Sequence, residues 1–115
     1  MSTTQAKQPR PLRDKELRQL LLEAIESGLY CGYEETIHAR FDNVERQIDL
    51  NDVLFGLKQA DWVLKHPPEF STDFWQWKYT IKTKDVEGDP IVIVVAVDTK
   101  GRSFEVITRW RPQST

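Results

Sequence analysis

The fold is decided by residues 90–110, which read PIVIVVAVDTKGRSFEVITRW. Every position from 91 to 97 is apolar, and a strand without polar alternation is typical of the covered centre of a sheet. Residues 98–101 have turn chemistry, so we expect a tight connection to a second strand over 104–110. The stretch therefore predicts a hairpin whose first strand is central and covered on both faces.

The segment just upstream alternates between apolar and polar side chains, with the period of two that characterises a strand. Its two faces are Trp75, Trp77, Tyr79 and Ile81 on one side, and Gln76, Lys78, Thr80 and Lys82 on the other. We expect a strand with one buried and one solvated face, joined to the central strand by a turn over residues 85–90.

The first half of the chain has helical periodicity instead. Apolar stripes predict helices over residues 14–27, 34–46 and 50–60, with Gly28 ending the first and Asp49 capping the third. Pro67 and Pro68 separate this half from the strands. The predicted fold class is α+β, with about three helices packed on a small antiparallel sheet. Residues 1–13 are expected to be a flexible arm before a single domain over 14–112.

The composition fits one soluble globular domain of 115 residues, with 39% hydrophobic and 30% charged side chains. A formal net charge of −2 argues against a general nucleic-acid binder, so any cationic site must be local. Cys31 is the only cysteine and excludes an internal disulfide. Two histidines, His38 and His66, make a poor metal site, and we expect neither metal nor cofactor. The N-terminus lacks a secretion signal's apolar core, which predicts a cytoplasmic protein without a membrane segment.

Over residues 36–111 the chain resembles a small bacterial family, the domain of unknown function DUF4258. The residues that carry the resemblance are His38, Arg46, Ile48, the pair Asp52 and Val53, the strand 94–97, and Val106, Ile107 and Thr108. That family is similar in turn to the superfamily of RelE-type toxin ribonucleases, which implies a RelE-like fold. One departure is that Asp42 stands where such domains often carry an arginine, while Arg40 lies two residues earlier.

The resemblance implies a metal-independent, RNA-cleaving toxin. Such cleavage needs a base, cations that stabilise the phosphorane, and an acid for the leaving oxygen. The predicted catalytic residues are His38, Arg46, Lys78 and Arg109, and the predicted RNA or partner contacts are Arg40, Lys82, Arg111 and Trp75. The expected partners are RNA or the ribosome, together with an antitoxin-like protein.

The same residues also allow simpler readings. His38 and Asp42 stand four apart and can form a surface pair, Arg46 can stabilise a helix end, and Lys82 can be a solvated edge lysine. Cys31 among aromatic residues is typical of a small buried hydrophobe. The alternative function is a non-catalytic protein-interaction module that uses helix 14–27 and the aromatic connector 62–77. Exposure of Phe74 or Trp75 would favour this alternative.

Overall fold

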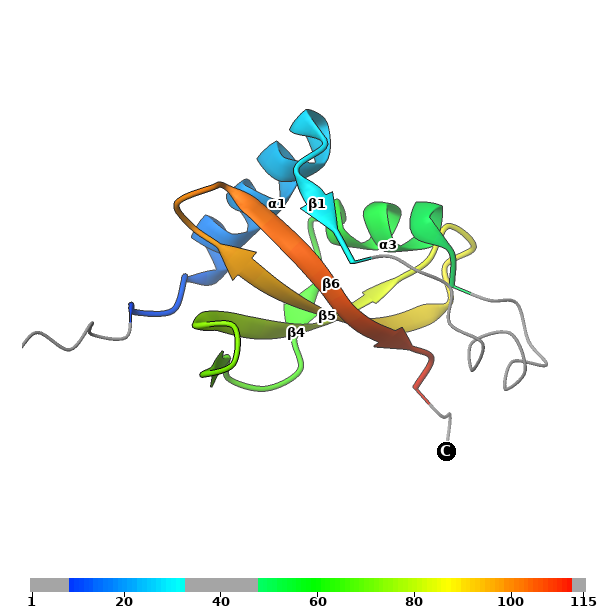
Figure 1. The fold of residues 1–115 in the computed structure, drawn as a ribbon. Helices are drawn as coiled ribbons and strands as arrows, with labels where there is room; N and C mark the ends of the chain where they lie inside the picture. Colours follow the sequence, from blue (N-terminus) through cyan, green and yellow to red (C-terminus); the bar gives the residue numbers. More distant parts are fainter. Residues whose placement is uncertain (1–8, 33–47, 113–115) are drawn as a thin grey trace, which may run out of the picture.

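The structure is a computed structural model that describes residues 9–32 and 48–112. Within these ranges, two helices pack on one side of a six-stranded mixed sheet (Figure 1), which confirms the α+β class. The helices are α1 (Asp14–Ser27) and α3 (Leu50–Leu57). The strands are β1 (Tyr30–Cys31), β2 (Val63–Leu64), β3 (Glu69–Ser71), β4 (Gln76–Lys84), β5 (Pro90–Asp98) and β6 (Ser103–Trp110).

The predicted hairpin forms the middle of the sheet. The strand order is β1-β6-β5-β4-β2, and β3 pairs with β4 beside β2. The β5–β6 pairing is antiparallel and shifts register between Val94 and Val95, where Ile107 is the extra residue of a bulge in β6. β1 pairs with β6 in parallel, so the prediction of a purely antiparallel sheet is wrong at this edge.

Both helices begin and end where local chemistry dictates. The Glu16 side chain accepts a hydrogen bond from the Arg13 backbone at the start of α1, and Gly28 ends this helix in the left-handed conformation. Asp49 caps α3 as predicted, because its side chain accepts from the Asp52 backbone while that of Asp52 accepts from Asp49. α3 stops at Leu57, three residues earlier than predicted. The predicted helix 34–46 lies outside the described residues, and neither described helix is long and apolar enough to span a membrane.

The core lies between the helices and the sheet. α1 contributes fully buried leucines from the predicted stripe, and α3 adds Val53 and Leu57. From β5 the core takes Ile91, Ile93 and Val95. The main core residues of α1 are Leu17, Leu20, Leu21 and Ala24.

As predicted, most side chains on both faces of β5 are buried, although helices do not cover both faces. Helices cover one face only, within the part of the chain that the structure describes (Figure 1). On the other face Val92 and Ala96 are each 1% exposed, whereas Val94 is partly exposed. We call this helix-free side the open face.

The described part of the predicted arm is held against the domain. The backbone N–H of Leu12 donates to the Tyr79 hydroxyl at 2.8 Å, and the Trp77 indole N–H donates to the Pro9 carbonyl at 2.6 Å. Leu12 packs against the core. Residues 9–12 therefore belong to the folded unit, because side chains of β4 form hydrogen bonds with their backbone groups.

Candidate functional site

The open face of the sheet is organised in three rows that run across β4, β5 and β6. Paired residues on neighbouring strands point to the same side, so the strand register decides which side chains meet. The rows are Lys82, Val92 and Trp110; Thr80, Val94 and Thr108; and Lys78, Ala96 and Glu105. The middle row carries two hydroxyl groups, and a lysine stands in each row beside it.

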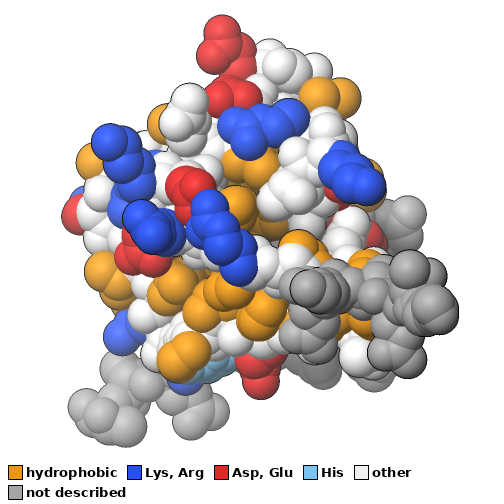
Figure 2. Space-filling model, turned by 90° about the vertical axis from the view of Figure 1, so that its left-hand side faces the viewer, with side chains coloured by type: hydrophobic (Ala, Val, Ile, Leu, Met, Phe, Trp, Pro, Cys, Tyr) orange, Lys and Arg blue, Asp and Glu red, His pale blue; other side chains and the backbone are white. Residues whose placement is uncertain are grey.

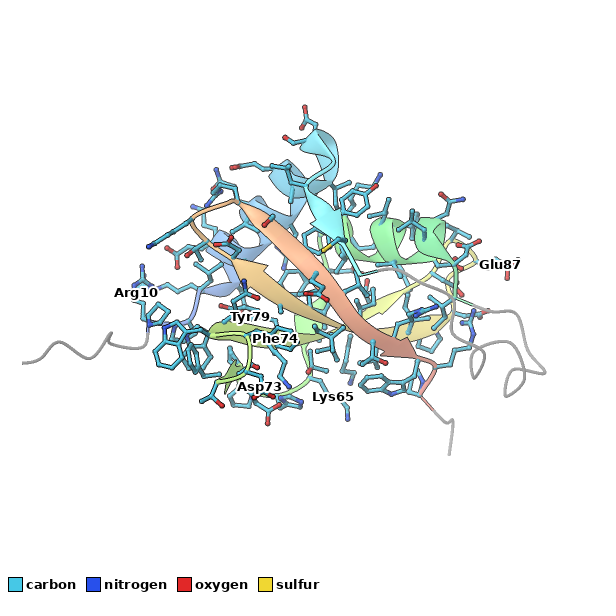
Figure 3. The ribbon with its side chains drawn as sticks, in the orientation of Figure 1. Arg10, Lys65, Asp73, Phe74, Tyr79 and Glu87 are labelled. Carbon is cyan, nitrogen blue, oxygen red and sulfur yellow. The ribbon has the colours of Figure 1, made fainter. Side chains whose placement is uncertain are left out.

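A third lysine joins this set from the edge of the sheet. Lys65 follows β2 and donates its backbone N–H to the Thr80 carbonyl at 2.8 Å. Figure 3 shows its side chain pointing away from the helices. Lys65, Lys78 and Lys82 thus surround Thr80, and we call them the lysine cluster.

The lysine cluster carries charge that no carboxylate of the described residues neutralises in an ion pair. Among the described residues, no ion pair within 4.0 Å involves any of its three members, although Glu69 stands opposite Lys78 in the pairing of β3 with β4. Lys65 and Lys82 are exposed, and Lys78 is half-buried. This arrangement offers ammonium groups to an anionic ligand on a face that no described helix blocks.

Aromatic surface lies on the same face. Trp110 stands across Val92 from Lys82 and is 39% exposed, so part of its indole surface is accessible to a ligand. A hollow of about 370 Å³ lies at the other end of the open face from Trp110. Ala96, Glu105 and Cys31 border it. Cys31 is exposed there, which contradicts the expectation of a buried cysteine. The open face thus has a basic, aromatic half and a half that carries Glu105 and Asp98.

The predicted catalytic set is only partly brought together. Arg109 pairs with Ile93, whose side chain is in the core, so Arg109 lies on the helix side of the sheet. Lys78 pairs with Ala96 and lies on the open face. A single site cannot contain both side chains, because the sheet separates them.

Arg111, a predicted RNA or partner contact, forms an ion pair within the domain. Its Nη1 lies 2.8 Å from Oδ2 of Asp85, and the arginine side chain is 17% exposed while that of Asp85 is fully buried. Oδ1 of Asp85 accepts backbone N–H groups from Glu87 and Asp89. The guanidinium therefore holds the β4–β5 turn in place. The same turn is bonded to α3, because the Val86 N–H donates a hydrogen bond to Oδ1 of Asp52.

The remaining predicted residues divide into two groups. His38, Arg40 and Arg46 lie outside the described residues, so their predicted roles stay predictions. Nδ1 of His66 lies 3.0 Å from the Pro67 carbonyl oxygen, and no group of metal-binding type occurs in the described ranges. Trp75 precedes β4 and lies in a turn, where its ring contacts Phe70 and takes no part in the three rows of the open face.

A second surface lies at the end of the molecule where β3 turns into β4. Phe74 is 52% exposed and Trp75 is 47% exposed, and the Trp75 ring stands edge-on to Phe70 at 4.9 Å. Trp77 makes a similar contact with Phe70 at 5.3 Å. We call Phe70, Phe74, Trp75 and Trp77 the aromatic end. Figure 2 shows this end of the molecule, with a band of hydrophobic side chains and Lys and Arg side chains beside it.

The backbone of the aromatic end is strained. Trp75 has φ of 53°, a left-handed conformation that a bulky residue rarely adopts. The Phe74 backbone N–H donates to the Ser71 hydroxyl, which helps to close the turn. The turn thus presents two large aromatic side chains to solvent at a cost in local conformational energy.

Sequence reasoning missed Lys65 and Trp110 as site residues. Lys65 follows a two-residue strand, which is too short to show an alternating pattern. Trp110 follows a bulge, which changes the relation between sequence parity and face. The sequence does show that basic residues are frequent after position 60. It does not show the strand register, which decides which of these residues lie together on one face.

A comparison with protein families finds a match for most of the sheet. Residues 36–111 match the family described as Domain of unknown function (DUF4258), and this range contains α3 and every strand from β2 to β6. No curated protein and no solved structure matches the chain. Helix α1 and strand β1 precede the matched range, although α1 supplies part of the core. Since the match covers about two-thirds of its length, the chain belongs to the DUF4258 family.

Proposed function

We propose that this protein binds single-stranded RNA on the open face of its sheet. The observation that carries the proposal is the lysine cluster, whose ammonium groups have no carboxylate partner within 4.0 Å among the described residues. Proteins that bind single strands combine cations for the phosphates with aromatic rings for the bases. Trp110 supplies such a ring beside Lys82, and the resemblance to RelE-type ribonucleases also supports an RNA ligand.

The finer proposal is that the bound RNA is cleaved in a toxin-like reaction. His38 would take the proton of the 2′-hydroxyl group, and Arg46 would stabilise the negative charge that develops on the phosphate. Lys78 remains a candidate for the same charge stabilisation, whereas Arg109 is left out because it lies on the helix side. A net charge of −2 gives little non-specific attraction to RNA, so we propose a presented substrate such as ribosome-bound message.

Binding is tested with a fluorescent single-stranded RNA of twelve nucleotides and two triple variants of equal charge. The first variant is Lys65→Ala, Lys78→Ala and Lys82→Ala on the open face. The control is Lys15→Ala, Lys58→Ala and Lys100→Ala, three exposed lysines on α1, after α3 and in the β5–β6 turn. Fluorescence anisotropy at low salt should show about tenfold or more weaker binding for the first variant only. Equal losses would leave only a general charge effect and contradict the proposal.

Stacking and cleavage are tested separately. Trp110→Leu should weaken RNA binding by about fivefold or more, since base stacking contributes about 1–3 kcal/mol per base.

His38→Ala and Arg46→Ala should relieve growth inhibition on expression and reduce cleavage of translated message by about 10²–10⁴-fold, with RNA binding retained. If the wild-type protein binds RNA but neither inhibits growth nor cleaves message, the binding proposal survives and the cleavage proposal fails.

The second candidate function is a protein-interaction module, and the exposed aromatic end favours it. Adjacent exposed aromatic residues in a strained turn are typical of an anchor for a protein partner. The predicted use of α1 is less favoured, because its apolar stripe is already buried in the core. On this view the aromatic end is the contact surface, and α1 supports the sheet.

This candidate is tested with Phe74→Ser combined with Trp75→Gly. Glycine removes the Trp75 ring and also relieves the left-handed backbone, so loss of binding cannot be blamed on a weakened turn. Val86→Ser is the control, since Val86 is 50% exposed in the β4–β5 turn. Cross-linking in cells followed by mass spectrometry should give a protein partner that the double variant loses and the control keeps. A partner retained by both variants would exclude the aromatic end as the contact.

A further inference from the structure

The segment of residues 9–12 is hydrogen-bonded to two aromatic side chains of β4. The Trp77 indole N–H donates to the Pro9 carbonyl at 2.6 Å, and two residues after Arg10 the Leu12 N–H donates to the Tyr79 hydroxyl at 2.8 Å. Figure 3 shows Arg10, Phe74 and Tyr79 at the same end of the molecule, with Glu87 at the opposite end. Two side chains of one strand therefore hold two backbone groups of this segment.

The segment is preset for an extended conformation. Each proline fixes its own φ near −65°, and Pro11 also biases Arg10 away from helical geometry. Arg13, which leads into α1, has φ of −75° and ψ of 161°, values typical of polyproline II. An extended proline-rich segment exposes its carbonyl groups, because polyproline II has no internal hydrogen bonds.

The aromatic end has the chemistry that such a segment needs. Aromatic grooves recognise proline-rich peptides through ring surfaces that pack against prolines and through polar tips that bond to the exposed backbone. Phe70 and Trp77 supply packed rings, and the indole N–H and the Tyr79 hydroxyl supply a donor and an acceptor. Part of the ring surface is free, since Phe74 and Trp75 stay about half exposed with the segment in place.

We propose that the aromatic end forms a binding site for an extended proline-rich peptide, which residues 9–11 of this chain occupy in cis while the contact of Leu12 with Tyr79 stays in place. A proline-rich segment of a partner protein then competes with the chain's own segment. The proposal deepens the interaction-module candidate, on which it rests, and it is independent of RNA binding.

The cis contact is suited to exchange. The outer part of the segment is held by the Trp77 hydrogen bond and by the ion pair of Arg10 with Glu16, whose side chains are 67% and 41% exposed. Exposed ion pairs contribute little to stability. Leu12 packs against the core and keeps the segment attached, so displaced residues remain nearby at a high effective concentration. A competing peptide therefore binds the wild-type chain weakly and binds a chain with an impaired cis segment more tightly.

The test uses the full chain and a labelled synthetic peptide that copies residues 8–13. The variant with Pro9→Ala and Pro11→Ala impairs the cis segment. By fluorescence anisotropy it should bind the peptide at least tenfold more tightly than the wild-type chain. A peptide in which both prolines are alanine should not bind either protein. Trp77→Phe, added to the proline variant, keeps a ring but removes the indole donor and should weaken peptide binding by at least fivefold.

A second measurement does not depend on these substitutions. In NMR spectra of the proline variant, the peptide should shift the indole N–H signal of Trp77 and leave that of the buried Trp62 unchanged. The proposal is overturned if wild-type and proline-variant chains bind the peptide equally, or if Trp77→Phe has no effect. If the peptide does not bind, but the double variant with Phe74→Ser and Trp75→Gly still loses a cellular partner, the interaction-module proposal stands and the partner is not proline-rich. If the peptide binds and no partner depends on those two residues, the peptide site stands while the Phe74 and Trp75 contact fails.

Discussion

Gly32 sets how closely β1 can approach β6. Its φ is +87°, and a Cβ atom there would lie 2.6 Å from Cγ of Glu105 and 2.7 Å from the Val106 carbonyl oxygen. Gly88 has nearly the same φ, +89°, with nothing within 4 Å of such an atom. We expect Gly88→Ala to cost about 1–2 kcal/mol from backbone strain alone and Gly32→Ala to cost clearly more. Denaturant unfolding of both variants measures the loss in free energy of unfolding. Equal losses would show that β1 is not tightly packed against β6.

Tyr79 makes the folded state sensitive to alkaline pH. Burial raises the pKa of its hydroxyl, and the hydrogen bond from Leu12 opposes this effect only in part. The protonated form is therefore favoured by folding, so its contribution is complete below the usual tyrosine pKa of about 10 and is lost as pH rises through the raised pKa. Tyr79→Phe should remove this alkaline loss. At neutral pH it should lower the free energy of unfolding by about 1–3 kcal/mol, because the Leu12 N–H loses its acceptor.

At the scale of elements, neighbouring positions in the middle of β5 differ in how much change they tolerate. Ile93 is fully buried beneath the helices, whereas Val94 lies on the open face between Thr80 and Thr108. Ile93→Asp should unfold the domain, since an unpaired buried charge costs several kcal/mol of a typical total of about 5–15. Val94→Asp should lower the melting temperature and leave the protein folded. Circular dichroism melts test this expectation, and unfolding of both variants would contradict it.

Helix α1 should be as important to stability as the elements within the family match. Leu20→Ala should cost about 2–5 kcal/mol, because this side chain is fully buried against the sheet and α3. Leu22→Ala on the same helix is the control, since Leu22 is 42% exposed and should cost less than about 1 kcal/mol. Similar costs for both substitutions, measured by denaturant unfolding, would show that α1 is an accessory element.

Long periodic segments could be predicted from the sequence, and short elements could not. The stripe of α1, the Asp49 cap and the apolar run of β5 each leave a signal over several residues. β1, β2 and β3 span two or three residues each and form because a partner strand is already present. Trp75 fitted the alternation of β4 but lies in a turn with positive φ. The grouping of lysines on the open face depends on register, which pairing determines.

At the scale of the whole molecule, a local basic surface lies on a protein with a net charge of −2. If three lysines contact phosphates, the logarithm of the RNA affinity should fall with the logarithm of salt concentration with a slope of about −2. Removing the lysine cluster should bring that slope close to zero, whereas the control triple variant should keep it. A salt-independent affinity in the wild-type protein would exclude phosphate contacts as the basis of binding.

The borders of the sheet are unusually short, and this limits how other chains can join it. On one side the last strand is β1, with two residues, and on the other side β2 and β3 divide the edge of β4 between them. Long flat edges recruit further strands through their unpaired backbone groups. At the β4 border of the described sheet, an arriving chain finds the two residues of β2 and the three residues of β3 with which to pair. A partner that approaches this border therefore has to recognise side chains, and copies of the domain resist stacking there edge to edge into fibrils.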